Sequence, residues 1–365
     1  MSKIGQKFSF LIPVITFAVL VVFMTGCQTG SEQQATSLLP ILEYQKPAFE
    51  FTEIVDGVYC AIGTGNLPAM CNAAIIINES DVIIVDTHVF PEAAAALLDE
   101  LKEITKKPVR YVINTHFHLD HVFGNQIYPS DVEIIGHEFT RDAIASGSSN
   151  SGRAYDLVLN EIVPNQIASL REKLDSVSDP EKRAELEQRV AIREKFLASA
   201  QAVEPRAPNI SFRQNLTLYR GDREIQLLFL GRGHTGGDVI VHLPHEGILI
   251  TGDLMFSGLP YMGNGFFSEW VGTLEQLKGL DFDWIIPGHG KPFQDRNIID
   301  YRQSYLRDFW ERAQEQYKAG ISAEEAAERI DMRDHSEHYP EIQSVGVPLH
   351  AAIRAYELLD MSTDR

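Results

Sequence analysis

The feature that most constrains this chain is one short run holding three histidines and an aspartate within six residues, Asn114-Thr115-His116-Phe117-His118-Leu119-Asp120-His121. The apolar residues 109–113 before it predict a buried strand. Because residues i and i+2 of an extended chain point to the same side, His116 and His118 can aim their rings at one point beyond the strand end. Asp120 and His121 come where we expect the chain to turn into a helix, so they can approach a second point beside the first.

The four side chains of this run are all typical metal ligands. Imidazole nitrogens and carboxylate oxygens are the groups by which proteins hold zinc and similar metals. The run therefore predicts a metal site at the end of the strand. The alternative is a strand end that carries polar residues without binding anything, and four donor side chains at this spacing argue against it.

Charge and composition limit the classes of partner. The chain has 365 residues, 44% of them hydrophobic, and a formal net charge of −19. The length suits one large domain with additions or two domains, and the hydrophobic fraction is too high for a disordered chain. So acidic a chain is a poor match for a nucleic acid or an anionic membrane surface. We therefore expect no nucleic-acid partner, although local basic pockets are not excluded, and the oligomeric state stays open.

The first residues predict a targeting segment. Two lysines precede the mostly apolar residues 8–24, and Thr25-Gly26-Cys27 follows. The pattern resembles a bacterial lipoprotein signal, cleaved before Cys27, which would then carry a lipid anchor to the membrane. Met24 departs from it, because such signals usually have Leu there. An uncleaved anchor and a plain secretory signal are the alternatives. All three place the rest of the chain in the bacterial cell envelope, and Gln28 favours the outer membrane, facing the periplasm.

Residues 1–26 are thus the predicted signal peptide, and the polar residues 27–50 are a predicted tether. Two cysteines then remain, Cys60 and Cys71, on segments that we expect to be neighbouring strands. In an oxidising envelope they could form a disulfide, and two buried free thiols are an equal alternative. Neither cysteine lies in a spacing typical of metal ligands.

Apolar runs and turn residues predict strands that alternate with helices before residue 146. The expected strands are 51–62 with a turn at Asp56-Gly57, a hairpin of 73–77 and 82–85, 109–113 and 132–135. The expected helices are 91–106, a short one near His121 and one from about His137. This alternation predicts a layered α/β domain.

The alternation stops at about residues 146–208, which we predict to be a helical insertion of two or three helices with a helix start at Asp179-Pro180. Its charged faces are expected to be solvated surface, and a role in roofing a pocket stays open. The strands then expected are 210–219, 224–230, 239–243, 247–251 and 284–286, with a helix at 272–279. From Asn297 the chain is expected to be mostly helical, and this tail could mediate dimerisation, cover the site or pack on a sheet.

Three further polar residues end apolar strands. They are His234 in Gly-His-Thr, Asp253 in Thr-Gly-Asp and His289 in Pro-Gly-His-Gly. Each is flanked by glycine, which lets the backbone approach closely. Singly, each could be an ordinary loop or turn residue. Together with the first run, they form a set of metal-ligand side chains at strand ends.

This ordered set resembles the metallo-β-lactamase superfamily of metallohydrolases over roughly residues 51–295. The matching positions are Asp86 after an apolar strand, His116-x-His118-x-Asp120-His121, His234, Asp253 and His289. The resemblance implies an α/β (α+β) fold, the four-layer αββα sandwich, with two facing sheets, helices outside and metals at one edge. The domain would span 51–297, with the helical insertion at about 146–208 and a helical C-terminal extension at 298–365.

The resemblance also implies a ligand set for two Zn²⁺ ions, with iron or manganese as alternatives. His116, His118 and His234 would hold the first ion. Asp120, His121 and His289 would hold the second, and Asp253 would bridge them. Asp86 would fix a ligand ring by a hydrogen bond. The remaining histidines match no ligand position and are expected at the surface or in packing: His88, His137, His242, His245, His335, His338 and His350.

The implied activity is hydrolysis, in which a hydroxide held by two metals attacks a carbonyl-type small-molecule substrate such as an ester, lactone, thioester or β-lactam. Asp120 would orient the hydroxide. Fold and metals do not choose among these substrates. Asp253 stands where true β-lactamases usually have Cys or Ser, and Phe256 offers no cation for a substrate carboxylate. A true β-lactamase is therefore an alternative to this general hydrolase, although an envelope location favours the β-lactamase.

Two loops are expected to shape the pocket, residues 64–70 and 256–267, the second either as an apolar wall or as core packing. Trp270, Leu274 and Leu277 share one helix face and are expected in the core. Two other functions stay as alternatives: a non-haem iron dioxygenase of the persulfide type, and a non-catalytic metal-binding envelope protein. The first normally uses one iron with fewer ligands, and the second would be expected to lack some of them.

Overall fold

The computed structural model describes residue 44 and residues 46–363, which fall within one unit, Ile41–Arg365. The predicted signal peptide, Cys27 and most of the predicted tether lie outside the described residues. Among the helices that the structure describes, none is long and apolar enough to cross a membrane.

The first sheet has seven strands in the order β1-β2-β3-β4-β5-β6-β7. Its first four strands are antiparallel neighbours, and β4 to β7 run parallel to one another. The strands are β1 (Phe49–Val55), β2 (Val58–Gly63), β3 (Ala73–Ile77), β4 (Val82–Val85), β5 (Val109–Ile113), β6 (Glu133–His137) and β7 (Ile210–Phe212). The predicted turn at Asp56-Gly57 and the predicted hairpin of β3 and β4 are therefore confirmed.

The second sheet has five strands in the order β12-β11-β10-β9-β8. The outer pair β11 and β12 is parallel, and the other pairs are antiparallel. The strands are β8 (Asn215–Arg220), β9 (Arg223–Leu228), β10 (Ile240–Leu243), β11 (Ile248–Gly252) and β12 (Trp284–Pro287).

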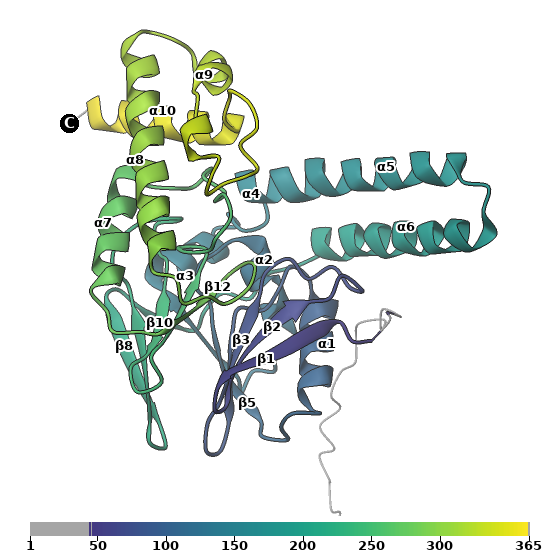
Figure 1. The fold of residues 1–365 in the computed structure, drawn as a ribbon. Coiled ribbons are helices and arrows are strands. Elements are labelled where there is room, and N and C mark those ends of the chain that lie inside the picture. Colours follow the sequence, from purple (N-terminus) through teal and green to yellow (C-terminus); the bar gives the residue numbers. More distant parts are fainter. Residues whose placement is uncertain (1–43, 45, 364–365) are drawn as a thin grey trace, which may run out of the picture. The chain divides into compact units, whose positions relative to one another are not determined.

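Helices cover the outer face of each sheet, and the two long helices of the insertion project away from the sandwich (Figure 1). Before the insertion the helices are α1 (Pro91–Leu101), α2 (Leu119–Val122), η1 (Phe123–Ile127) and α3 (Glu138–Ala145). The insertion holds α4 (Arg153–Tyr155), the π-helical η2 (Asp156–Ile162), α5 (Val163–Ser176) and α6 (Pro180–Gln201). After the second sheet begins come α7 (Phe267–Lys278), α8 (Asn297–Lys318), α9 (Ala323–Arg329), η3 (Arg333–His335) and α10 (Leu349–Thr363).

Three buried hydrophobic clusters show why these elements form four layers. Successive side chains of a strand point to opposite faces of a sheet. On β11, Ile248 and Ile250 join the cluster between the two sheets, whereas Leu249 joins the cluster beneath the C-terminal helices. On β4, Ile83 faces the second sheet, whereas Ile84 packs toward α1. The expected αββα sandwich is thus the observed fold.

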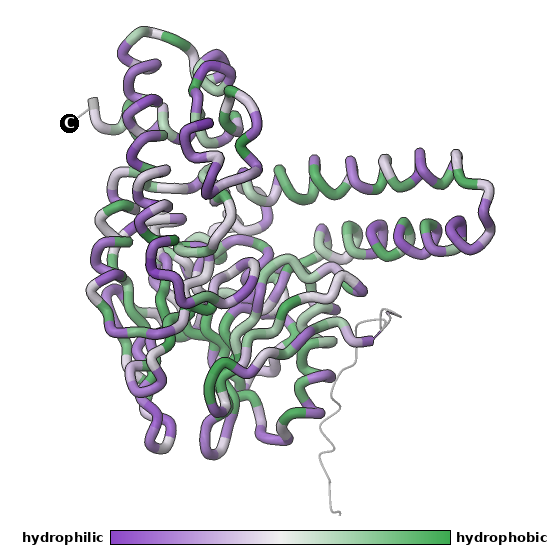
Figure 2. Tube along the Cα trace, viewed as in Figure 1, coloured by the Kyte–Doolittle hydropathy of each residue, from purple (hydrophilic) through white to green (hydrophobic). Residues whose placement is uncertain are grey.

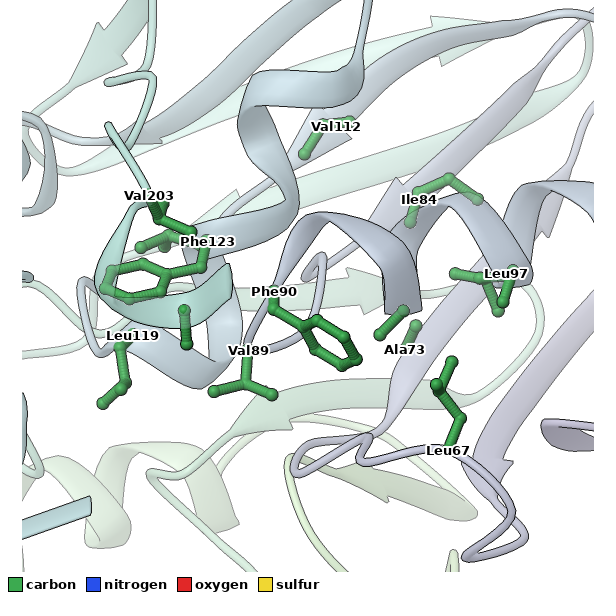
Figure 3. Close-up of a cluster of buried hydrophobic side chains, with 14 of the residues drawn as sticks. Leu67, Ala73, Ile84, Val89, Phe90, Leu97, Val112, Leu119, Phe123 and Val203 are labelled. Atoms are coloured by element: carbon green, nitrogen blue, oxygen red, sulfur yellow. The ribbon is translucent and has the colours of Figure 1, made fainter. Parts of the chain in front are cut away.

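The outer cluster of the first sheet is the largest of the three (Figure 3). Phe90 and Leu97 from the region of α1 pack over Ile84 and Val112 of the sheet. Leu67 of the predicted pocket loop 64–70 belongs to this core and is buried, so that loop is anchored beneath α1 rather than free at the surface.

The insertion forms an antiparallel pair of helices, α5 and α6, which pack on one another (Figure 1). As predicted, α6 starts after Asp179, whose carboxylate caps the amides of Glu181 and Lys182. In Figure 2 α6 is largely hydrophilic except toward its C-terminal end. There the ring of Phe196 meets that of Phe90 edge-on at a centroid distance of 5.0 Å, which ties the pair to the core.

Three predicted boundaries were wrong. Helix α1 ends at Leu101 rather than at residue 106, because the next residues are mostly exposed and the chain turns back into β5. Residues 210–219 are two strands in different sheets, since the chain crosses from the first sheet to the second at Arg213 and Gln214. Helix α7 begins at Phe267 rather than at 272, because Phe267 and Trp270 are buried against the second sheet.

The two remaining predictions concern the cysteines and the tail. Cys60 and Cys71 are both buried and free, so the alternative of two thiols is the observed one. The boundary predicted at residue 297 coincides with the start of α8, and Ile299 and Leu306 of that helix share a core cluster with the second sheet. The tail therefore packs on the sheet, while the predicted domain limits themselves stay a prediction.

Candidate active site

The predicted ligands lie on loops and one short helix that follow strand ends. His116 and His118 come directly after β5, and Asp120 and His121 are on α2. His234 lies in the loop after β9, Asp253 directly follows β11, and His289 follows β12. Three of these strands, β5, β9 and β11, are interior strands of their sheets, and β12 is an edge strand paired with β11, so the sandwich fixes where the side chains emerge.

Three histidines converge at the first predicted metal position. His118 Nδ1 lies 3.1 Å from His116 Nε2 and 3.0 Å from His234 Nε2. All three rings are almost completely buried, with exposed fractions of 1%, 3% and 0% for His116, His118 and His234. Their ring nitrogens lie close enough together to be ligands of one ion.

Asp120, His121 and His289 converge at the second predicted position. Asp120 Oδ2 lies 3.5 Å from His121 Nε2 and 3.2 Å from His289 Nε2. The His289 side chain is 31% exposed, whereas His121 is fully buried. The second group is thus the more exposed of the two, through His289.

Asp253 reaches both groups through its two carboxylate oxygens. Its Oδ2 lies 3.5 Å from His234 Nε2, and its Oδ1 lies 3.4 Å from His121 Nε2 and 3.3 Å from His289 Nε2. All seven predicted ligands are therefore brought together, and the position of Asp253 between the two groups is that of a bridging carboxylate. Their assignment as metal ligands remains a prediction.

Asp86 supports the site from behind, as predicted for an orienting residue. Its Oδ2 lies 2.7 Å from His121 Nδ1, which leaves Nε2 of that ring to face the site. Asp86 also accepts hydrogen bonds from the backbone amide and hydroxyl of Thr115, at 2.8 and 2.7 Å. It therefore orients His121 on α2 and fixes the turn that carries His116.

Charge is distributed unevenly over the two groups. Burial lowers the pKa of His116 and His234 well below the usual range, so these rings are neutral and offer lone pairs. Burial alone would also lower the pKa of His289, but the carboxylates of Asp253 and Asp120 outweigh it and raise that pKa to about 10. Two buried carboxylates thus require positive charge at this place.

The donor set fits a pair of divalent metal ions. Nε2 of His121 and Oδ1 of Asp253 are buried without a hydrogen-bond partner among the described residues, and both atoms face the centre of the cluster. Neutral imidazoles and carboxylates are ligands that zinc accepts, and a cation would satisfy these orphaned atoms.

The structure adds site residues that sequence reasoning missed. Asn264 Oδ1 lies 3.0 Å from His118 Nε2, on the side of that ring away from the metal position. Asn72 donates through its amide nitrogen to the carbonyls of Pro287 and Gly290, at 2.9 and 2.7 Å, and so holds the loop of His289. Neither asparagine stands in a motif, and no local signal could have found them.

The predicted pocket loop 256–267 contributes both an aromatic wall and core packing. The ring of Tyr261 lies edge-on to His118 at a centroid distance of 5.4 Å, and its hydroxyl is buried without a hydrogen-bond partner among the described residues. Met262 and Phe267 instead belong to the hydrophobic core. Trp270, Leu274 and Leu277 are core residues, which confirms their prediction.

The histidines expected to match no ligand position lie apart from the two groups of ligands or pack beside them. His137 caps α3 by accepting from the amide of Phe139. His350 of α10 packs on Tyr261 with a centroid distance of 4.7 Å. His88 is buried and stacks on Phe49, with its Nδ1 3.5 Å from Cys71 Sγ. None of these residues is in a group that could hold a metal among the described residues.

Comparison with known families finds one match over most of the described chain. The sequence model of the metallo-beta-lactamase superfamily matches residues 67–147 and 156–289. This span contains all seven predicted ligands and Asp86.

Two relatives are similar to this chain over 254 and 279 residues. The 2,4-dinitroanisole O-demethylase subunit alpha of Nocardioides sp. (strain JS1661) is 25% identical over 68% of this chain and 60% of its own. The linear primary-alkylsulfatase of Pseudomonas sp. (strain ATCC 19151) is 24% identical over 71% of this chain and 49% of its own. The chain thus spans about half to three-fifths of the length of these relatives.

Solved structures share the fold. A metallo-beta-lactamase from Pontibacter korlensis superposes with a TM-score of 0.51 and 18% identity, covering 71% of this chain and 99% of that one. The inverting sec-alkylsulfatase Pisa1 from Pseudomonas sp. superposes with a TM-score of 0.57 and 17% identity, covering 84% of this chain and 49% of that one.

Proposed function

This chain belongs to the metallo-beta-lactamase superfamily, and from that premise we propose that it is a dinuclear metal-dependent hydrolase of small molecules. The observation that carries the proposal is the position of Asp253, whose two oxygens face one group of three histidines and a second group of one aspartate and two histidines. A single ion would not require a carboxylate shared in this way.

We assign the chain's residues as follows. His116, His118 and His234 hold one ion, and Asp120, His121 and His289 hold the other, with Asp253 between them. Two Zn²⁺ ions, when bound, supply a Lewis acid for the substrate and a water whose pKa is lowered to about 7. Asp120 orients the attacking water by accepting its hydrogen bond, because His121 and His289 keep this carboxylate ionised. Tyr261 excludes water from the side of His118.

For the substrate, we propose a small molecule with an ester-type bond. The sequence suggested a carbonyl ester, lactone or thioester. The alkylsulfatase and the 2,4-dinitroanisole O-demethylase subunit that are similar to this chain add an alkyl sulfate and an aryl methyl ether, which share an oxygen-linked carbon with esters. The aromatic wall of Tyr261 and Phe256 supports a substrate with an apolar group. A sulfate ester is the second candidate, because one alkylsulfatase is similar to this chain in sequence and another in structure.

The proposal is tested with zinc-loaded protein against three chromogenic substrates: 4-nitrophenyl acetate, 4-nitrophenyl sulfate and a chromogenic cephalosporin. We expect chelator-sensitive turnover of the acetate or the sulfate and little turnover of the cephalosporin. Asp120→Ala should abolish turnover without unfolding the protein. Asp222→Ala, at an exposed turn residue, is the matched control and should leave it unchanged. Absence of chelator-sensitive turnover on all three would contradict the proposal, and a bound mononuclear iron would favour the dioxygenase alternative.

We also propose that the protein is a lipoprotein of the bacterial envelope. This rests on the sequence of residues 1–28 alone, which lie outside the described residues. Metabolic labelling with a radioactive fatty acid in a bacterial host should mark the wild-type chain and not Cys27→Ser. Equal labelling of both would contradict lipid attachment at Cys27.

A further inference from the structure

Three arginines from outside the sheets donate hydrogen bonds to the backbone of residues 256–265, the site loop, which lies beside the predicted metal ligands. Arg302 of α8 donates from Nη2 to the carbonyls of Phe256 and Gly258, at 2.8 and 2.5 Å. Arg153 of α4 donates to the carbonyl of Gly263, and Arg354 of α10 to that of Gly265, both at 2.9 Å. The insertion and both long C-terminal helices therefore fix this loop.

The site loop delivers one side chain to a predicted metal ligand. Asn264 Oδ1 lies 3.0 Å from His118 Nε2, and an amide oxygen can only accept, so Nε2 of His118 is the protonated nitrogen. Nδ1 is then left unprotonated, and it is the atom that faces His116 and His234. The position of the loop thus decides which nitrogen of His118 is offered to the metal.

Arg302 differs from the other two arginines in its surroundings. Arg153 and Arg354 both pair with Glu357 and are partly exposed. Arg302 is completely buried, and it pairs with no carboxylate among the described residues. Its charge is stabilised by the two loop carbonyls, by the hydroxyl of Tyr339 at 3.3 Å and by aromatic rings. A buried charge without a carboxylate partner is costly, so a stability role alone explains it poorly.

The aromatic neighbours of Arg302 lead to both groups of ligands. Its guanidinium lies 4.8 Å from the ring of Phe256 and 5.9 Å from that of Trp270. Phe256 in turn contacts His289 with a centroid distance of 5.7 Å, and Trp270 contacts His234 at 5.5 Å. The buried side chain of Arg302 therefore contacts two aromatic residues that pack against the two groups of ligands. It also binds the backbone of the loop that carries Asn264.

We propose that Arg302 is a positioning residue of the metal site: by binding the carbonyls of Phe256 and Gly258, it holds the site loop so that Asn264 fixes the metal-facing nitrogen of His118. The inference rests on the proposed function, because it assigns His118 to a metal. It gives the C-terminal extension a part in the site although none of its residues is a predicted ligand.

The test is a double-mutant cycle on the full-length protein, with Co²⁺ binding to the metal-free chain as the readout. Lysine at position 302 keeps the charge, but its single ammonium cannot bind two carbonyls in a fixed plane and stack on the rings. We expect Arg302→Lys and Asn264→Ala each to weaken Co²⁺ binding about tenfold or more and to alter the visible spectrum of the bound ion in the same way. The double variant should bind no more weakly than either single variant.

Arg296→Lys is the matched control. Arg296 also donates to a backbone carbonyl, that of Leu280 at 2.9 Å, and lies 4.0 Å from the ring of Phe282, but it does not touch the site loop. Its Co²⁺ affinity and spectrum should equal those of the wild type. Should Arg302→Lys fail to fold, Arg302→Met, which removes the buried charge at similar length, takes its place in the cycle.

The Co²⁺ measurements test the positioning role of Arg302 separately from the proposed metal-dependent function. Wild-type Co²⁺ binding in Arg302→Lys would overturn the positioning role, and so would losses that multiply in the double variant. In both cases the proposed function would not be contradicted as long as the wild-type protein binds two Co²⁺ ions. A wild-type chain that binds no Co²⁺ would overturn the proposed function and the positioning role together. Non-additive losses with the same spectral change support the proposal.

Discussion

At the residue scale, the backbone at Gly288 packs closely against Asp253 and Gly252. A Cβ at this position would lie 2.1 Å from Asp253 Oδ1 and 2.8 Å from the carbonyl carbon of Gly252, so the carboxylate that we propose as the bridge would have to move. We expect Gly288→Ala to displace Asp253 and to reduce bound zinc below two ions per chain, as measured by elemental analysis of the folded protein.

The control for this prediction is Gly272→Ala on α7, where a Cβ would have nothing within 4 Å. Alanine is favoured over glycine inside a helix by about 1 kcal/mol, so this variant should keep its zinc and be slightly more stable. If Gly288→Ala bound two zinc ions with wild-type affinity, the close packing of Asp253 would have no bearing on the site.

Asp253→Asn tests the bridging position itself. The amide keeps the shape of the side chain but removes the negative charge that faces His234, His121 and His289. We expect the zinc content to fall from two ions to one or none and turnover to be lost. Asp222→Asn, at an exposed turn, should retain both ions. Two tightly bound ions in Asp253→Asn would contradict the assignment of a bridging carboxylate.

At the scale of elements, Phe196 joins the insertion to the sandwich. Its side chain is 0% exposed, and three residues further along α6 Ser199 donates to Glu92 of α1 at 2.6 Å. Phe196→Ala removes the ring that packs on Phe90 and should lower the free energy of unfolding by about 3–5 kcal/mol. Denaturant unfolding followed by circular dichroism measures this change.

Gln188→Ala, on the exposed part of the same helix, is the control for that change and should stay within about 0.5 kcal/mol of the wild type. A similarly small effect of Phe196→Ala would mean that the α5–α6 pair contributes nothing to the stability of the sandwich.

Elements were predictable from the sequence where their signal is local. The β3–β4 hairpin and β5 have β-branched runs bounded by turn residues, and α6 has a capping Asp179 followed by proline. The crossing at Arg213 and Gln214 was missed because neither of these two residues is a glycine or proline, and nothing local marks a change of sheet between β7 and β8. The start of α7 was missed because burial of Phe267 against the second sheet determines it.

At the scale of the whole molecule, some residues of the candidate site were predictable from local sequence and others were not. Its predicted ligands could be named because each follows a strand and stands in a short motif. Asn264 and Tyr261 contact His118 from another part of the chain, and Arg302 contacts the loop that carries them, although it is separated from Phe256 by 46 positions. Such contacts depend on how α7 and α8 pack on the second sheet, and a single sequence carries no record of that packing.

Removal of the metals should affect the whole fold, because the ligands join both sheets. His116 and Asp120 follow β5 of the first sheet, whereas Asp253 and His289 follow β11 and β12 of the second. Ions bound at the proposed site would cross-link the two sheets at this edge and would favour only the folded state. At free metal one hundredfold above Kd, one such site stabilises the fold by about 2.7 kcal/mol.

Chelation should therefore lower the Tm of the wild-type chain, and added Zn²⁺ should restore it, as measured by thermal unfolding at fixed protein concentration. Asp253→Asn should start from a lower Tm in zinc and lose less on chelation, because fewer ions link its sheets. Gly272→Ala should respond to chelator as the wild type does. A wild-type Tm that does not change on chelation, with metal loss verified by elemental analysis, would mean that the sandwich edge is already fixed by protein contacts between the sheets, such as those of Asn72 with the carbonyls of Pro287 and Gly290.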